Sequence, residues 1–136
     1  MALDIGSRTI GVALSDPLKI TARPLMTIRR TSIDRDYQAL LSVASEFHVD
    51  RIILGHPAHQ DGSESDVMKH IGPLAERLRL DSGLKVDWQD ERLSTREAEQ
   101  LMSLHRVPVV QRRKKRNEYA AAVILEWYLK ECGSLL

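Results

Sequence analysis

The chain has 136 residues, of which 43% are hydrophobic and 29% charged, and its formal net charge is only +1. These values are typical of a soluble globular protein of one domain that is long enough for a real core. The single cysteine, Cys132, excludes an intramolecular disulfide and a paired-cysteine metal site, which fits a reducing cytoplasm. No apolar stretch approaches the roughly 20 residues that span a bilayer, so no membrane partner is expected. No secretory signal is expected either.

The first half of the chain predicts strands followed by a helix. Strands are expected over 1–6, 10–16 and 24–30, with a tight glycine-containing turn joining the first two as a hairpin. Apolar residues recur at helical spacing over 34–47 and predict a helix there. The continuous apolar run at 51–55 is typical of a strand that is buried on both faces.

The second half predicts alternating helices and a strand. The expected elements are a helix over 67–80 that Gly72-Pro73 should break or kink, a strand over 84–88, a helix over 94–104, an irregular stretch over 106–111 and a last helix from about Asn117 to Cys132. The order β-β-β-α-β-α-β-α-α indicates an antiparallel hairpin sheet that parallel crossovers extend, with helices on both faces. In such α/β sheets, sites lie beyond the carboxyl ends of the strands.

Polar side chains fall at three places where such a site would form. Asp4 lies in an apolar strand, Asp90 and Glu91 follow the fifth strand, and Asn117 opens the expected last helix. Taken alone, Asp4 is explained as a turn acceptor, and Asp90-Glu91-Arg92 as a solvated loop. Taken together, the carboxylates would meet near one edge of the sheet. Clustered carboxylates need a cation to coexist, and oxygen ligands favour Mg²⁺ or Mn²⁺.

Five motifs occur in a specific order: LDIGSRTIGVALSD, TARPL, IILGHPAHQDGSES, QDERLSTREAE and AAAVILEWYL. With them the chain resembles the YqgF or RuvX family, whose members are proposed as pre-16S rRNA nucleases and as Holliday junction resolvases. The resemblance covers nearly the whole chain. It implies one ribonuclease-H-like nuclease domain over residues 1–136, with a mixed five-stranded sheet made of an antiparallel three-strand meander plus two parallel strands, and helices on both faces.

The resemblance also implies roles for single residues. Asp4 matches the catalytic, metal-binding aspartate of the first strand, and Glu91 matches the second acidic position, with Asp90 beside it as a further catalytic candidate. Where the family has an aspartate at the start of the last helix, this chain has Asn117, which offers Mg²⁺ an oxygen but no charge. Asn117 is also a good helix N-cap residue, and the two roles are compatible. Glu118 is the other candidate for the missing carboxylate.

Six cationic side chains lie among the eleven residues from Arg106 to Arg116. Five of them, Arg112, Arg113, Lys114, Lys115 and Arg116, form a continuous run that we name the basic run. A charge run is usually a solvated face, but here no anion lies between Gln111 and Arg116, and cations at a helix N-terminus oppose its dipole. We therefore expect the basic run to bind nucleic-acid phosphates, with Arg92 and Arg8 as further candidates. For Arg8, a solvated hairpin charge is an equal alternative.

The leading hypothesis is a cytoplasmic nuclease that uses Mg²⁺ or Mn²⁺ to hydrolyse phosphodiester bonds, most simply at the 5′ end of pre-16S rRNA. Resolution of branched DNA in recombination is the close alternative, for which a homodimer would be natural. A second hypothesis is a nucleic-acid-binding ribosome-assembly factor with weak or absent catalysis. A third starts from DIGSRTIGVAL, which also resembles the phosphate-binding hairpin of actin-like kinases and ATPases, although 136 residues cannot supply their second lobe.

Overall fold

The computed structural model describes residues 1–56, 64–90 and 94–133, except the side chains of 64–67 and 133. Its elements in chain order are β1 (Ala2–Ile5), β2 (Thr9–Ser15), β3 (Ala22–Arg29), α1 (Ile33–Glu46), β4 (Arg51–His56), α2 (Glu64–Asp81), β5 (Lys85–Asp90), α3 (Ser94–Leu104) and α4 (Val109–Gly133). All nine elements that the sequence predicts are present, and their order is the predicted one.

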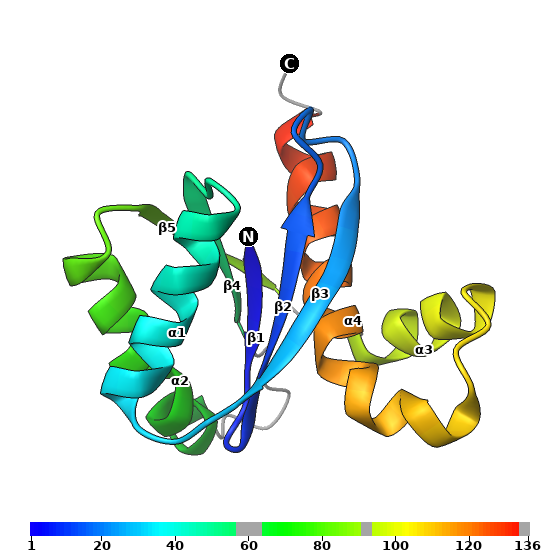
Figure 1. Ribbon diagram of the computed structural model, residues 1–136, viewed down its shortest axis with the longest axis horizontal. Coiled ribbons are helices and arrows are strands. Elements are labelled where there is room, and N and C mark those ends of the chain that lie inside the picture. Colours follow the sequence, from blue (N-terminus) through cyan, green and yellow to red (C-terminus); the bar gives the residue numbers. More distant parts are fainter. Residues whose placement is uncertain (57–63, 91–93, 134–136) are drawn as a thin grey trace.

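The five strands form one mixed sheet in the order β3-β2-β1-β4-β5 (Figure 1). β1, β2 and β3 pair antiparallel, whereas β4 and β5 run parallel to β1. This confirms the expected meander with two parallel strands. Because β1, β4 and β5 are parallel, their carboxyl ends lie at the same edge of the sheet.

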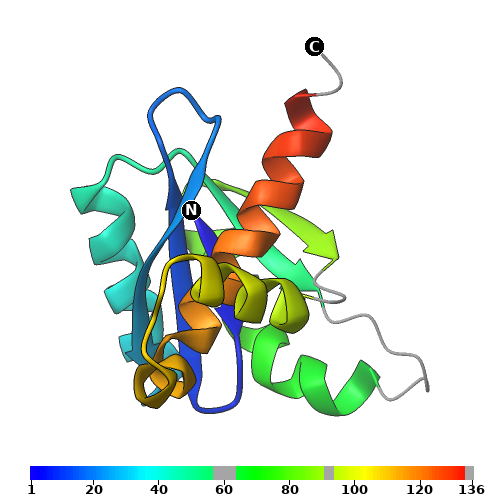
Figure 2. The same cartoon turned by 90° about the vertical axis from the view of Figure 1, so that its right-hand side faces the viewer.

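Helices cover both faces of the sheet, as expected. On one face, α1 and α2 bury the side chains of Leu3, Val12 and Leu54, which alternate along their strands with residues of the other face. On that other face α4 crosses the sheet (Figure 2). Ala121 and Ile124 of α4 pack there against Ala2 and Ile53. α3 packs against α4. None of the described helices is both long enough and apolar enough to cross a membrane.

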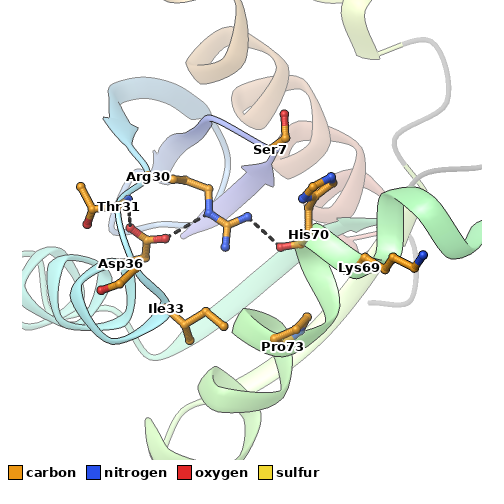
Figure 3. A pocket seen from close by; sticks show the side chains of 9 residues that line it. Ser7, Arg30, Thr31, Ile33, Asp36, Lys69, His70 and Pro73 are labelled. Atoms are coloured by element: carbon orange, nitrogen blue, oxygen red, sulfur yellow. Dashed lines mark hydrogen bonds and ion pairs between the residues drawn. The ribbon is translucent and has the colours of Figure 1, made fainter.

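The helix α2 is not broken at Gly72-Pro73 and continues to Asp81, so of the expected break or kink the break does not occur. A proline inside a helix removes one backbone hydrogen bond and disturbs the carbonyls of the preceding turn. Arg30 donates a hydrogen bond of 2.7 Å to the carbonyl of His70 in that turn (Figure 3). We attribute the survival of the helix partly to this contact, which the tertiary structure supplies.

The last helix begins at Val109 rather than at Asn117, which corrects the predicted start by eight residues. The segment before Asn117 carries no apolar stripe, because Val109 and Val110 are strongly exposed, so periodicity could not reveal it. Arginine and lysine favour helices, and Pro108 directly precedes the first turn, where its carbonyl accepts a hydrogen bond from the Gln111 amide. The basic run therefore lies inside α4 and does not lead into it.

Candidate active site

Asp4 lies on the face of the sheet that α4 covers. Its neighbours Leu3 and Ile5 belong to the core under α1 and α2, whereas Ala2 packs against α4, so strand alternation directs Asp4 toward α4. The side chain is half-buried near the carboxyl end of β1. This is the edge at which β4 and β5 also end, as the sequence-based expectation requires.

The residue opposite Asp4 on β2 is Gly11. A β-carbon at Gly11 would lie 2.0 Å from the carbonyl oxygen of Asn117 and 2.7 Å from the amide nitrogen of Glu118. No side chain fits there, so the glycine allows the backbone of α4 to touch the sheet beside Asp4. Sequence analysis missed this role of Gly11, although a glycine inside an otherwise apolar strand is a known signal of close backbone approach.

Asn117 is not the N-cap of the last helix, because it lies two turns inside α4. Its side-chain amide nitrogen donates a short hydrogen bond to the hydroxyl of Thr9 at the start of β2. The amide therefore ties α4 to β2 next to the Asp4–Gly11 pair, and its oxygen remains as a potential ligand. A threonine hydroxyl can both donate and accept a hydrogen bond. An aspartate at position 117 could consequently keep this contact with the direction of donation reversed.

Glu118 directly follows Asn117 in α4, and its carboxyl group is half-buried, as that of Asp4 is. Burial raises the pKa of the Glu118 side chain above its ordinary value, and the nearby charge of Lys115 partly opposes this effect. The described part of the chain thus offers Asp4, Asn117 and Glu118 in one region, where the resemblance expects an aspartate in place of Asn117.

Asp90 is the last residue of β5 and pairs in register with His56 of β4. Val86 of the same strand packs against the core under α1 and α2, so alternation places Asp90 on that face of the sheet, opposite to Asp4. Strand alternation thus directs these two carboxyl groups to opposite faces of the sheet. Glu91 and Arg92 directly follow β5 in the chain and lie outside the described residues.

The cations of the basic run differ in how the protein holds them. Arg116 forms an ion pair of 2.8 Å with Glu99 of α3, an anion that a scan of the run itself could not find. Arg112 donates hydrogen bonds to the Val107 carbonyl and the Ser103 hydroxyl. Because the run starts at the fourth residue of α4, the opposing helix dipole is also weaker than expected, since the effect fades within the first turn.

Arg113 and Lys114 are exposed on α4. Arg8 is exposed in the turn between β1 and β2, at the edge where β1 ends. Within the part of the chain that the structure describes, no ion pair holds these three side chains, so they can reach a ligand in solvent.

The type of donor atom near Gly11 determines which metal ion could bind there. Within residues 1–56, 64–90 and 94–133, no group of three or more His, Cys, Asp or Glu side chains could hold a metal ion. The side chains of this region that could bind a metal ion are oxygen donors, namely the Asp4 carboxylate, the Asn117 amide oxygen and the Glu118 carboxylate. These donor types suit Mg²⁺ or Mn²⁺, whereas zinc sites usually contain histidine or cysteine. The described donors fit such an ion only as part of a set that includes a further carboxylate.

Solved structures share this architecture. The chain aligns with RuvC of T. thermophilus in complex with a Holliday junction substrate, at a TM-score of 0.58, 14% identity and coverage of 96% of this chain and 92% of that chain. It also aligns with the fowlpox virus Holliday junction resolvase, at a TM-score of 0.53 and 13% identity over 95% of this chain and 96% of that one. The sheet order, the helix layers and these likenesses define a ribonuclease-H-like α/β fold.

Sequence comparison identifies the family. The family model described as "RuvX: Holliday junction resolvase" matches residues 1–131. The chain is 40% identical to a protein of Desulforamulus reducens over 129 residues, which cover 95% of this chain and 94% of the relative. It is 41% identical to a protein of Myxococcus xanthus, with coverage of 95% and 85%. Both relatives carry the name "Putative pre-16S rRNA nuclease". The chain belongs to the RuvX family.

Proposed function

We propose that this chain is a metal-dependent nuclease that hydrolyses phosphodiester bonds in the maturation of the 5′ end of pre-16S rRNA. The observation that carries the proposal is the position of Asp4, which faces the Asn117–Glu118 turn of α4 at the edge where the parallel strands end. Membership of the RuvX family and the names of the relatives support the activity and the rRNA substrate. They also favour a nuclease over the actin-like nucleotide-binding alternative.

The proposed ligands of Mg²⁺ or Mn²⁺ are Asp4, Glu91 and the side-chain oxygen of Asn117. Such an ion, when bound, lowers the pKa of an attacking water and offsets the charge of the phosphate. The hydrogen bond from Asn117 to Thr9 orients the amide. Exposed cations at the same edge and along α4 would hold the phosphates on either side of the cleaved bond.

The first prediction concerns the carboxylates of the site. Asp4→Asn keeps the size of the side chain and removes its charge, so we expect metal-dependent cleavage to fall at least about 100-fold. Asn117→Asp should lower the Mn²⁺ concentration needed for half-maximal cleavage, because it adds a negative charge and can keep the contact with Thr9. Cleavage of a precursor rRNA leader and of a four-way DNA junction, with Mg²⁺ or Mn²⁺, measures both effects.

Asp50→Asn is the matched control, because Asp50 is exposed and precedes β4 at the opposite edge of the sheet. It should cleave like the wild type. Unchanged activity in Asp4→Asn would refute the metal-nuclease proposal. If the wild type is inert and the Asn117→Asp variant is active, the protein is instead a nucleic-acid-binding assembly factor.

The second candidate function, resolution of branched DNA, is favoured by the description of the family and by the fold, and cleavage of the junction alone would select it.

The exposed cations of the basic run are expected to contribute more to nucleic-acid binding than the paired one. Arg113→Gln and Lys114→Gln should each make the negative slope of the logarithm of the association constant against the logarithm of salt concentration less steep. The change should be about 0.7 on single-stranded and about 0.9 on duplex substrate. Arg116→Gln should change the slope less, because Glu99 already holds the Arg116 guanidinium. Fluorescence anisotropy of labelled RNA over a range of salt concentrations measures this, with Lys130→Gln at the far end of α4 as control. Equal slopes in all four variants would mean that the basic run is only a solvated face.

A further inference from the structure

The first two residues of α4 are apolar side chains that the protein leaves in solvent. Val109 is 78% exposed and Val110 is 86% exposed, and we name this pair the apolar tip. Figure 1 shows that the end of α3 and the first turns of α4 project sideways from the sheet, so the apolar tip lies at a protruding corner. An isolated exposed apolar residue is ordinary on a protein surface. Two adjacent ones at a protruding helix end form a candidate contact surface, and no role derived above uses them.

The corner that carries the apolar tip is firmly held. Val107 is buried in the core between α3 and α4. Arg112 donates hydrogen bonds of 3.0 Å to the carbonyl of Val107 and 3.1 Å to the hydroxyl of Ser103. Arg106 has a left-handed backbone conformation, and its amide donates to the carbonyl of Ser103. The two valines therefore reach solvent from a fixed backbone. A β-branched side chain in a helix also has little rotamer freedom to lose on binding.

Positive charge lies beside the apolar tip on the same side of the helix. Residues four apart in a helix are neighbours on its surface, so Arg113 lies next to Val109 and Lys114 next to Val110. Both cations are exposed, and within the described residues neither of them forms an ion pair. The sequence has no aspartate or glutamate from position 100 to position 117. Charge complementarity therefore favours an anionic ligand, whose apolar part would meet the two valines.

Nucleic acid with unpaired bases has both of these properties. In a continuous duplex the flat faces of the bases are covered by their stacked neighbours, whereas single strands, loops and branch points expose them. Proteins bind such faces with apolar side chains as well as aromatic ones. From Val110 to Asn117, α4 advances about 10.5 Å, which is roughly three steps of 3.4 Å along a strand. The apolar tip is thus within reach of a strand at the candidate site, since α4 covers the face of the sheet toward which Asp4 points.

We propose that Val109 and Val110 contact the bases of an unpaired segment of the substrate, while Arg113 and Lys114 hold its phosphates. The start of α4 would then favour substrates with single-stranded or branched segments over continuous duplex. The identity of the ligand rests on the proposed function. The contact itself does not depend on cleavage, so it is tested by binding alone.

The test compares two variants in EDTA, which prevents metal-dependent cleavage. Val109→Ser/Val110→Ser removes the apolar surface and keeps the helix, because serine and valine have similar helix propensities. Leu18→Ser is the matched control, because Leu18 is 77% exposed in the turn between β2 and β3, at the opposite edge of the sheet from Asp4. Fluorescence anisotropy measures the affinity for three labelled probes of equal length. They are a single-stranded RNA, the same strand in a continuous duplex, and an abasic strand, which has the phosphates without the bases.

We expect the double variant to bind the single strand at least about fivefold more weakly than Leu18→Ser does, because the apolar contact with the base faces is lost. Its affinity for the duplex and for the abasic strand should stay within about twofold of the control, since the phosphate contacts are intact. Equal affinity of the two variants for the single strand, or an equal loss on the abasic strand, would overturn the proposal.

A second measurement shows whether the bases lie at the apolar tip. In a sample with ¹³C-labelled valine methyl groups, the single strand should shift the Val109 and Val110 resonances through the ring currents of the bases, and the abasic strand should not. If these methyl groups respond only to an acidic, leucine-containing peptide, the ligand of the apolar tip is a protein and the proposal is wrong. Normal cleavage by a protein whose double variant binds like the control refutes this inference alone. Selective binding of unpaired strands without any cleavage refutes only the nuclease function.

Discussion

Replacement of Gly11 by alanine is expected to lower the free energy of unfolding by about 1–3 kcal/mol, and to reduce nucleic-acid cleavage further than this loss of stability explains. The added β-carbon would lie 2.0 and 2.2 Å from the carbonyl oxygen and carbon of Asn117. Both are backbone atoms, so no side-chain rotation can relieve the contact. The helix α4 must move away from β2, which shifts Asn117 and Glu118 relative to Asp4.

Gly72→Ala is the matched control for this substitution. A β-carbon at Gly72 meets nothing within 4 Å outside its chain neighbours. The gain in helix propensity is offset by the crowding that a β-carbon causes before Pro73, so the change should stay below about 1 kcal/mol. Chemical denaturation measures both variants, and the hydrogen bond between Asn117 and Thr9 can be followed by NMR. Equal stability of Gly11→Ala and wild type would show that α4 does not press on β2 at this position.

The second large effect is expected at Arg30. Arg30→Met should destabilise the protein by about 3–5 kcal/mol, because it leaves a buried carboxylate without its cation. The side chain of Asp36 is only 2% exposed and that of Arg30 only 12%. The carbonyls of Gly6 and His70 would lose their donor in addition.

Arg79→Met provides the comparison at the surface. Arg79 pairs with Glu76 three residues earlier in α2, and both side chains are more than half exposed. Exposed pairs contribute little, so this variant should lose less than about 1 kcal/mol. The double variant Arg30→Met/Asp36→Leu should recover a large part of the loss, because it removes the unpaired charge. An Arg30→Met protein as stable as Arg79→Met would mean that water, and not Arg30, satisfies the Asp36 carboxylate.

Local patterns predicted most of the secondary structure of this chain. The helix expected over 94–104 is observed as α3 with the same bounds, and the apolar run at 51–55 is β4 with one further residue. Such elements are readable because their burial alternates or repeats with the period of the backbone. The start of α4 is not readable in this way. Its first two residues, Val109 and Val110, are exposed although they are apolar, and the cations that follow them form no apolar stripe.

The part of the candidate site that sequence could predict was the acidic residue at the end of β1. Its location follows from the strand order, since parallel strands end at one edge of the sheet. The environment of Asn117 could not be predicted, because it depends on Thr9, which lies more than a hundred positions earlier in the chain. The same holds for Glu99 beside Arg116 and for the contacts of Arg30 with Asp36, Gly6 and His70.

The sequence by itself therefore determined the order of the elements, the two faces of the sheet and the resemblance to a nuclease family, because these features depend on periodicity and on residue type. Only the tertiary structure decided what Asn117 does. It lies inside α4 and bonds to Thr9, and Gly11 lets its backbone touch the sheet next to Asp4. The physical reason is that contacts between distant segments depend on the space that packing leaves, and a glycine without a β-carbon creates that space here.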